Sequence, residues 1–183
     1  MKTVQRNMIA DYLDVGASDT AEYVLMGSGF TSLDESPGAQ TETKVYINQA
    51  SASTTIKSYE TQFPFESELI ADEKAIMALY KVGRDHLTGS DAEFDYVRVD
   101  LFDTETEGTY PARKFRVAAE ISDFAGEGGE TVIVSGNLNA VGDPIQGTFN
   151  PSTKTFTVNS DDIMYTAKVG GAKVGKSKVG KLK

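Results

Sequence analysis

Apolar and polar residues alternate along several stretches of the chain, and this alternation predicts a protein built mainly of β-strands. A period of two places apolar side chains on one face of a strand and polar side chains on the other. The stretches with this pattern are residues 43–47, 54–65, 96–101, 115–121, 132–138, 145–149 and 154–158. We therefore expect a mainly β fold, an antiparallel β-sandwich or a partly open barrel.

One segment, residues 72–86, has the period of a helix. Ala75, Ile76 and Leu79 recur at spacings of three and four, and Asp72 can cap the first turn. A single helix between strands argues against repeated β-α-β units. We expect one α-helix packed on the sheet of a domain that covers residues 22–165.

Three segments have no period that suggests a core element. We expect residues 1–21 to form an N-terminal arm or a leading strand, and residues 34–53 to form a long polar loop. Long loops in compact domains are usually functional or disordered. Residues 166–183 repeat Lys-Val-Gly and are expected to form a flexible basic tail.

Gly27 and Gly29 predict a bend within a strand.

Charge divides the chain into an acidic body and a basic end. The 183 residues contain 18 basic and 27 acidic side chains, for a net charge of −9, and the first 165 residues alone have a net charge of −15. The basic tail holds Lys168, Lys173, Lys176, Lys178, Lys181 and Lys183. It is interpreted as an arm that docks on an acidic neighbour, as a non-specific grip on nucleic acid, or as a solvated tail. The acidic body disfavours binding of nucleic acid through phosphate contacts.

Residue types with catalytic or metal-binding chemistry are sparse. The absence of Cys and the single histidine, His86, exclude thiol nucleophiles, disulfides and two-histidine devices. Gly27-Ser28-Gly29 lacks the lysine of a phosphate loop, and residues 103–108 begin like a calcium loop but place Lys114 at position twelve. No carboxylate pair stands out. We expect no enzymatic activity, no cofactor and no metal. The sequence contains no apolar stretch long enough to suggest a membrane span or a signal peptide.

Taken in order, six segments make the chain resemble the tail tube (major tail) protein of long, flexible-tailed bacteriophages. The resemblance covers about residues 20–158. Its segments are residues 27–33, 37–49, 59–66, 97–100, 116–124 and 142–149. The Lys-Val-Gly tail departs from the family pattern.

The resemblance implies a structural virion protein. In that family, homohexameric rings stack head to tail into a tube that conducts DNA during ejection. A sheet of each subunit lines the lumen, the helix packs outside it, and the long loop and terminal arms bridge successive rings. The implied partners are further copies of the chain and the tail terminator, tape measure and distal tail proteins, with DNA passing without specific binding and no membrane. The implied location is the phage tail, preceded by the host cytoplasm during assembly.

Two sets of residues are candidates for these roles. If Tyr59, Phe63, Val117, Ile121, Val132 and Leu138 face the core, alternation places a polar set on the opposite, lumen-facing side. The candidate lumen residues are Glu60, Gln62, Glu120, Ser122 and Asn137. The candidate inter-ring loop residues are Pro37, Gly38, Lys44, Tyr46 and Asn48.

Two other functions are kept as alternatives. The tube of a contractile injection system shares the fold and differs in binding a sheath. A carbohydrate-binding or adhesive β-sandwich is the other alternative, although the absence of Trp counts against stacking on sugars.

Overall fold

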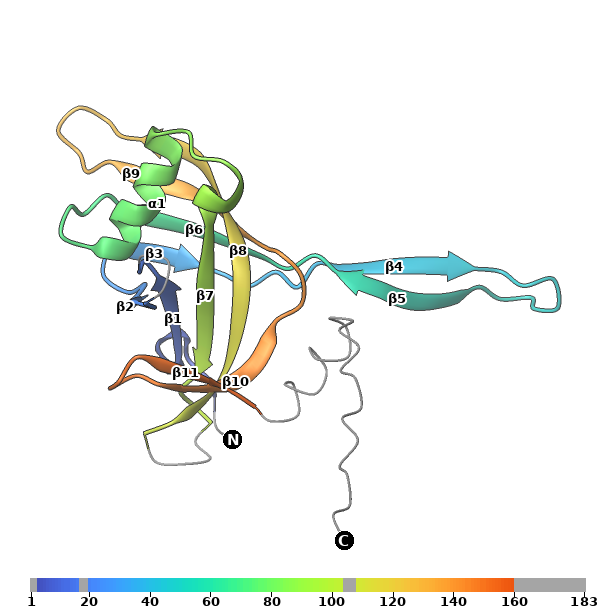
Figure 1. Cartoon of the computed structure of the whole chain (residues 1–183). Helices are drawn as coiled ribbons and strands as arrows, with labels where there is room; N and C mark the ends of the chain where they lie inside the picture. Colours follow the sequence, from blue (N-terminus) through green and yellow to red (C-terminus); the bar gives the residue numbers. More distant parts are fainter. Residues whose placement is uncertain (1–2, 17–19, 104–107, 160–183) are drawn as a thin grey trace, which may run out of the picture.

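The structure is a computed structural model that describes residues 3–16, 20–103 and 108–159. A nine-stranded antiparallel sheet forms the body, and a separate two-stranded hairpin projects from it (Figure 1). The elements are η1 (Arg6–Met8), β1 (Ile9–Asp14), β2 (Tyr23–Leu25), β3 (Phe30–Leu33), β4 (Ala39–Lys44), β5 (Ser53–Tyr59), β6 (Gln62–Glu68), α1 (Lys74–Arg84), η2 (Gly89–Ala92), β7 (Glu93–Asp100), β8 (Tyr110–Ala125), β9 (Ile133–Ala140), β10 (Ile145–Asn150) and β11 (Thr155–Val158). The expected mainly β fold with one helix is confirmed.

The body sheet runs in the order β2-β1-β7-β8-β9-β6-β3, and β10 pairs with β8 and β11. It is curled but not closed. Its first and last strands, β2 and β3, are joined by residues 26–29, where Gly29 adopts a positive φ of 81°. The bend predicted at these glycines therefore separates two strands at opposite ends of the sheet.

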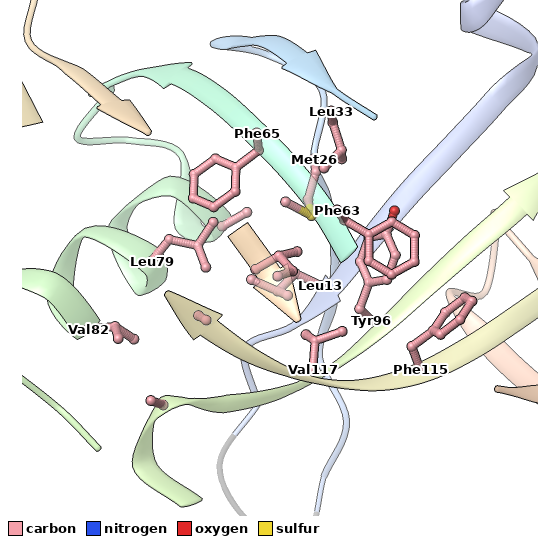
Figure 2. Packing of buried hydrophobic residues seen from close by; sticks show 14 of the residues in the cluster. Leu13, Met26, Leu33, Phe63, Phe65, Leu79, Val82, Tyr96, Phe115 and Val117 are labelled. Carbon is pink, nitrogen blue, oxygen red and sulfur yellow. The ribbon is translucent and has the colours of Figure 1, made fainter. Parts of the chain in front are cut away.

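The main core lies on the face of the sheet that α1 covers. Phe63, Tyr96 and Phe115 meet there, with ring centroids 4.7 Å and 4.9 Å from Phe63 (Figure 2). The helix contributes Ile76 and Leu79, both fully buried. Its N-cap is Glu73, which makes no side-chain capping bond, so the expected cap at Asp72 is wrong.

A second buried cluster lies on the opposite face of β1 and β7. Tyr12 packs on Phe149 of β10 with ring centroids 4.5 Å apart, and Val97 and Val99 are fully buried beside them. β1 thus has core on both faces. Of the two alternatives for residues 1–21, the leading strand is confirmed for β1 and the arm is wrong there, because this segment is a buried strand of the sheet.

Two further expectations differ from the structure. The expected single strand at residues 54–65 is broken at Glu60 and Thr61 into β5 and β6. Tyr59 therefore lies on the projecting hairpin and is 60% exposed, not in the core, and Val132 lies outside β9 and is exposed. The expected loop at residues 34–53 contains β4, which pairs with β5.

Candidate assembly surfaces

Polar side chains cover the face of β6, β9 and β8 that points away from the helix. The strand register places Asn137 between Pro64 and Glu120, and Asn139 beside Gln62. Asn139 donates a hydrogen bond from Nδ2 to Glu120 Oε2 at 2.9 Å. We call this surface the polar sheet face. It is defined by Gln62, Pro64, Glu66, Glu68, Glu93, Asp95, Lys114, Arg116, Glu120, Asp123, Ser135, Asn137 and Asn139.

Three of the five candidate lumen residues share this face, and two do not. Gln62, Glu120 and Asn137 lie together on it. Ser122 is the extra residue of a bulge between Ile121 and Asp123, so it lies outside the alternation. Glu60 lies in the crossover from β5 to β6, where it accepts a hydrogen bond from Gln40 of the hairpin at 3.2 Å. The alternation predicts Glu60 and Ser122 on this face only if their strands are continuous, and the structure interrupts both strands at these positions.

Acidic groups exceed basic groups on the polar sheet face, and its basic groups are already paired. Arg116 contacts Glu93 at 3.1 Å and Asp95 at 3.2 Å, and Lys114 contacts Asp95 at 3.2 Å. Sequence reasoning missed the further acids Glu66 and Glu68, although the strict alternation of residues 62–68 was a usable signal. A phosphate approaching this surface would meet uncompensated carboxylates rather than free cations.

The β4–β5 hairpin is the second candidate surface. It extends away from the body without packing on it (Figure 1), and nearly all of its residues are exposed. At its tip, three consecutive large apolar residues face solvent: Val45 is 66% exposed, Tyr46 is 54% exposed and Ile47 is fully exposed. An isolated two-stranded hairpin is marginally stable in water, and exposed apolar residues grouped at one place are typical of an interaction surface.

The candidate loop residues lie at the two ends of the hairpin. Pro37 and Gly38 are at its root, where Gly38 has φ 62° and a Cβ would lie 2.3 Å from the Glu60 carbonyl oxygen. Lys44 ends β4 and pairs with Glu42 at 3.1 Å. Tyr46 and Asn48 lie in the tip between β4 and β5. The structure therefore separates these residues into a root group and a tip group.

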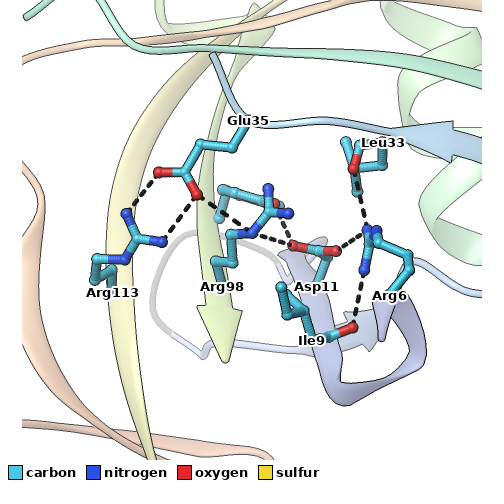
Figure 3. A network of polar contacts seen from close by, with 8 residues as sticks. Arg6, Ile9, Asp11, Leu33, Glu35, Arg98 and Arg113 are labelled. Atoms are coloured by element: carbon cyan, nitrogen blue, oxygen red, sulfur yellow. Dashed lines mark hydrogen bonds and ion pairs between the residues drawn. The ribbon is translucent and has the colours of Figure 1, made fainter. Parts of the chain in front are cut away.

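A buried charge network fixes the root of the hairpin to the sheet. Glu35, three residues before Gly38, accepts two hydrogen bonds from Arg113, at 2.6 Å and 2.9 Å, and lies 3.4 Å from Arg98 Nε (Figure 3). Arg98 is almost fully buried and also lies 3.7 Å from Asp11. Its Nη1 has no hydrogen-bond partner. No feature of the sequence pattern indicated this network, because its members come from four separate segments.

The far end of the network is centred on Asp11, which is 1% exposed. Its carboxylate accepts a hydrogen bond from the Tyr96 hydroxyl and pairs with Arg6. Burial, with the charge of Asp11, holds the pKa of Tyr96 well above its usual value, so the hydroxyl remains a donor. The network therefore joins the N-terminal segment, the body and the hairpin root.

Glu35 makes hairpin anchoring sensitive to acid. Burial raises the pKa of Glu35, but the hydrogen bonds and charge of Arg113 and the charge of Arg98 outweigh burial and hold it below its usual value. A lowered pKa stabilises the folded state above the unfolded-state pKa, and this stabilisation is lost as pH falls through the folded-state pKa. We expect Glu35→Gln to lower the thermal midpoint at pH 7, with the difference from wild type shrinking below about pH 4.

Thermal unfolding across pH, read by circular dichroism, measures this effect. Glu68→Gln is the matched control, because Glu68 is exposed on the polar sheet face. A Glu35→Gln deficit that is unchanged between pH 7 and pH 3 would contradict the assigned charge interaction.

Among the residues that the structure describes, no group of three or more His, Asp or Glu side chains could hold a metal ion. No helix among the described residues is long and apolar enough to cross a membrane. The calcium-like segment at residues 103–108 is largely outside the described residues, and so are Lys168, Lys173, Lys176, Lys178, Lys181 and Lys183 of the expected basic tail.

Comparison with solved structures identifies the architecture. No protein-family model matches the chain, and no curated protein matches its sequence. The SPP1 tail tube, solved by solid-state NMR and cryo-EM, superposes with a TM-score of 0.62 over 97% of this chain and 91% of its own, at 11% identity. The chain has the fold of a phage tail tube protein.

Two other assemblies contain similar chains. A chain from the tail of an empty GTA particle, computed with C6 symmetry, has a TM-score of 0.52 at 11% identity and covers 85% of this chain and 100% of its own. A chain of the anti-feeding prophage baseplate has a TM-score of 0.47 at 9% identity, over 80% of this chain and 95% of its own. The first two comparisons rest on structure, because their sequence identity is only 11%, and they show the fold of this chain alone: the tail tube fold.

Proposed function

We propose that this chain is the subunit of a phage tail tube, in which copies form hexameric rings that stack into a conduit for DNA. The observation that carries the proposal is the β4–β5 hairpin: a domain with the tail tube fold extends an arm whose apolar tip is exposed among the residues that the structure describes. An arm of this kind gains stability only when another molecule covers it. The protein acts by assembly rather than by catalysis.

The polar sheet face is proposed as the lumen wall. Its excess of carboxylates and its internally paired Arg116 and Lys114 leave few cations to hold phosphates. DNA binding by proteins depends on lysine and arginine contacts that release counterions. Repeated around a ring, this surface would bind DNA phosphates only weakly and would let DNA pass through the tube.

The remaining parts of the proposal concern partners and the tail. A tube of this kind would end at tail terminator and distal tail proteins and enclose a tape measure protein, in a virion assembled in the host cytoplasm. The lysines of residues 166–183 are proposed to contact the acidic body of a neighbouring copy, since several exposed ion pairs together add a salt-sensitive contribution.

Self-assembly of the purified chain tests the proposal. We expect concentrated protein to form rings or tubes in electron micrographs, and light scattering to rise with concentration, both with and without EDTA. A heterologous interface that closes into a ring and also stacks has no upper limit of size along the stack. Monodisperse monomers throughout the concentration series would contradict the proposal, and monomers that bind glycans would favour the adhesive β-sandwich.

A further inference from the structure

The buried guanidinium of Arg98 is shared between two carboxylates. Its Nε lies 3.4 Å from Glu35 Oε2 and 3.7 Å from Asp11 Oδ1, on a line between the two groups (Figure 3). Both distances exceed the roughly 2.7–3.2 Å of a typical N–H···O hydrogen bond. The Nη1 atom is buried and has no hydrogen-bond partner. A buried cation with a free donor and two carboxylates within reach has two available arrangements, one closer to each carboxylate.

Each carboxylate also has a second cation, and the two cations differ in how accessible they are. Glu35 accepts two hydrogen bonds from Arg113, whose side chain is 30% exposed. Asp11 is 1% exposed and pairs with Arg6, whose side chain is 49% exposed. Arg6 comes from the short η1 helix near the N-terminus. It is therefore the cation of this network that another molecule can reach most easily.

Removal of Arg6 from Asp11 changes the balance at Arg98. Asp11 keeps the hydrogen bond from the Tyr96 hydroxyl, but Arg98 becomes its remaining cation. A buried carboxylate is costly unless it is paired, so Arg98 is drawn toward Asp11. Because Glu35 lies on the other side of the guanidinium, the same movement takes Arg98 away from Glu35 (Figure 3).

We propose that Arg98 is a switch that couples the N-terminal segment to the root of the β4–β5 hairpin. With Arg6 on Asp11, Arg98 is shared with Glu35 and the root is held by two arginines. When an acidic group of another molecule captures Arg6, Arg98 moves to Asp11 and the root keeps Arg113 alone. The coupling acts within one chain and does not depend on tube formation. Its physical basis is one side chain with two arrangements that both sites bias.

Backbone hydrogen bonds at the root report its state. The Ser36 amide donates to the Gln62 carbonyl at 2.8 Å, and the Gln62 amide donates to the Ser36 carbonyl at 2.9 Å. Hydrogen exchange at these two amides measures how often the root opens locally. The Val141 amide, which donates to the Arg116 carbonyl at 2.8 Å, reports the body instead.

Hydrogen exchange of the dilute full-length chain tests the coupling. We expect Arg6→Ala to accelerate exchange at the Ser36 and Gln62 amides by about fivefold or more, the lower end of coupling between two sites, and to leave Val141 unchanged. The matched control is Arg84→Ala, which removes an exposed arginine that pairs with Asp85 at the end of α1. It should leave all three amides unchanged. No acceleration at the root, or equal acceleration at Val141, would overturn the inference.

A second background separates the switch from a direct contact. Arg6 also donates a hydrogen bond to the Leu33 carbonyl at 3.1 Å, two residues before Glu35. Asp11→Asn removes the charge that draws Arg98 and leaves the contact with Leu33 available. In this background we expect Arg6→Ala to accelerate root exchange by less than about twofold, below the range of coupled sites. Equal acceleration in both backgrounds would assign the effect to Leu33 and overturn the switch.

The NMR signal of the Arg98 Nε–H group follows the switch directly and needs no second background. We expect this signal to shift in Arg6→Ala and to stay in place in Arg84→Ala. An Arg98 signal that is the same in wild type and Arg6→Ala would overturn the inference. All of these measurements report on single molecules, so they leave the proposed tube function standing whichever way they fall, and a chain that forms no tubes leaves the switch standing.

Discussion

Excision of the β4–β5 hairpin is expected to abolish self-assembly while the domain remains folded. The hairpin has its own two-stranded sheet and contributes no residue to either buried cluster. Its removal therefore costs the body little of the apolar burial that stabilises it. The loss should appear only in the contacts between molecules that we propose for the exposed tip.

The root of the hairpin provides a clean point for the excision. The Glu60 amide donates a hydrogen bond to the Gly38 carbonyl at 3.0 Å, so the two ends of the excised segment are already adjacent. Residues 39–59 can be replaced by Asn-Gly, which forms a tight turn between paired strands. The matched control is Thr54→Ser, which keeps the hairpin and the hydroxyl that contacts Thr43.

Three measurements decide the result. Electron microscopy and light scattering report assembly, and circular dichroism against temperature reports the fold. We expect the excised chain to unfold cooperatively within a few degrees of wild type and to form no tubes at any concentration tested, while Thr54→Ser assembles normally. Tubes formed by the excised chain would show that the arm is dispensable, and loss of its thermal transition would show that the arm belongs to the folding core.

Removal of the Asp11 carboxylate is expected to destabilise the fold strongly. Asp11 accepts hydrogen bonds from Arg6 and the Tyr96 hydroxyl and forms an ion pair with Arg98 at 3.7 Å. Asp11→Ala therefore leaves the buried guanidinium of Arg98 with Glu35 as its remaining carboxylate partner. Breaking a buried ion pair from one side costs about 3–5 kcal/mol. For a chain of this size, that cost corresponds to a fall in thermal midpoint on the order of 10 °C.

A double variant separates the charge effect from the packing effect. Replacing the two residues together, as Asp11→Ala with Arg98→Met, also removes the buried guanidinium that has lost one of its two carboxylate partners, and should recover part of the lost stability. Asp143→Ala, at an exposed loop position, is the control and should stay within about 0.5 kcal/mol of wild type. A loss below about 1 kcal/mol for Asp11→Ala, or no recovery in the double variant, would contradict the role assigned to the pair.

The sequence predicts those strands that have one buried face and one solvent-exposed face. β8 and β9 can be predicted from their alternation because their outer residues, such as Glu120 and Asn137, lie at a polar surface. β1 cannot be predicted in this way. Ala10 and Tyr12 are buried in one cluster and Leu13 in the other, so both faces are covered and no period of two remains.

The hairpin and the charge network could be predicted only in part, for a different reason. β4 and β5 have no buried face within the chain, so their composition resembles that of a loop, and only the polar length of the segment indicated a functional excursion. Asp11, Glu35, Arg98 and Arg113 are spread over about a hundred residues and meet through tertiary folding. One-dimensional patterns contain no distance across a sheet, so neither their contacts nor the true position of Glu60 follows from spacing.

The hairpin is a long arm whose root is held to the body by the buried charge network at Glu35. A strand of seven residues spans about 24 Å at roughly 3.4 Å per residue, so a tilt of about 10° at the root displaces the tip by about 4 Å. The two hydrogen bonds from Arg113 to Glu35, together with the nearby Arg98, therefore help to fix the direction in which the hairpin projects from the body. In the proposed tube, a small rotation at this root would let neighbouring copies change their relative angle while each body stays rigid, as a bendable tube requires.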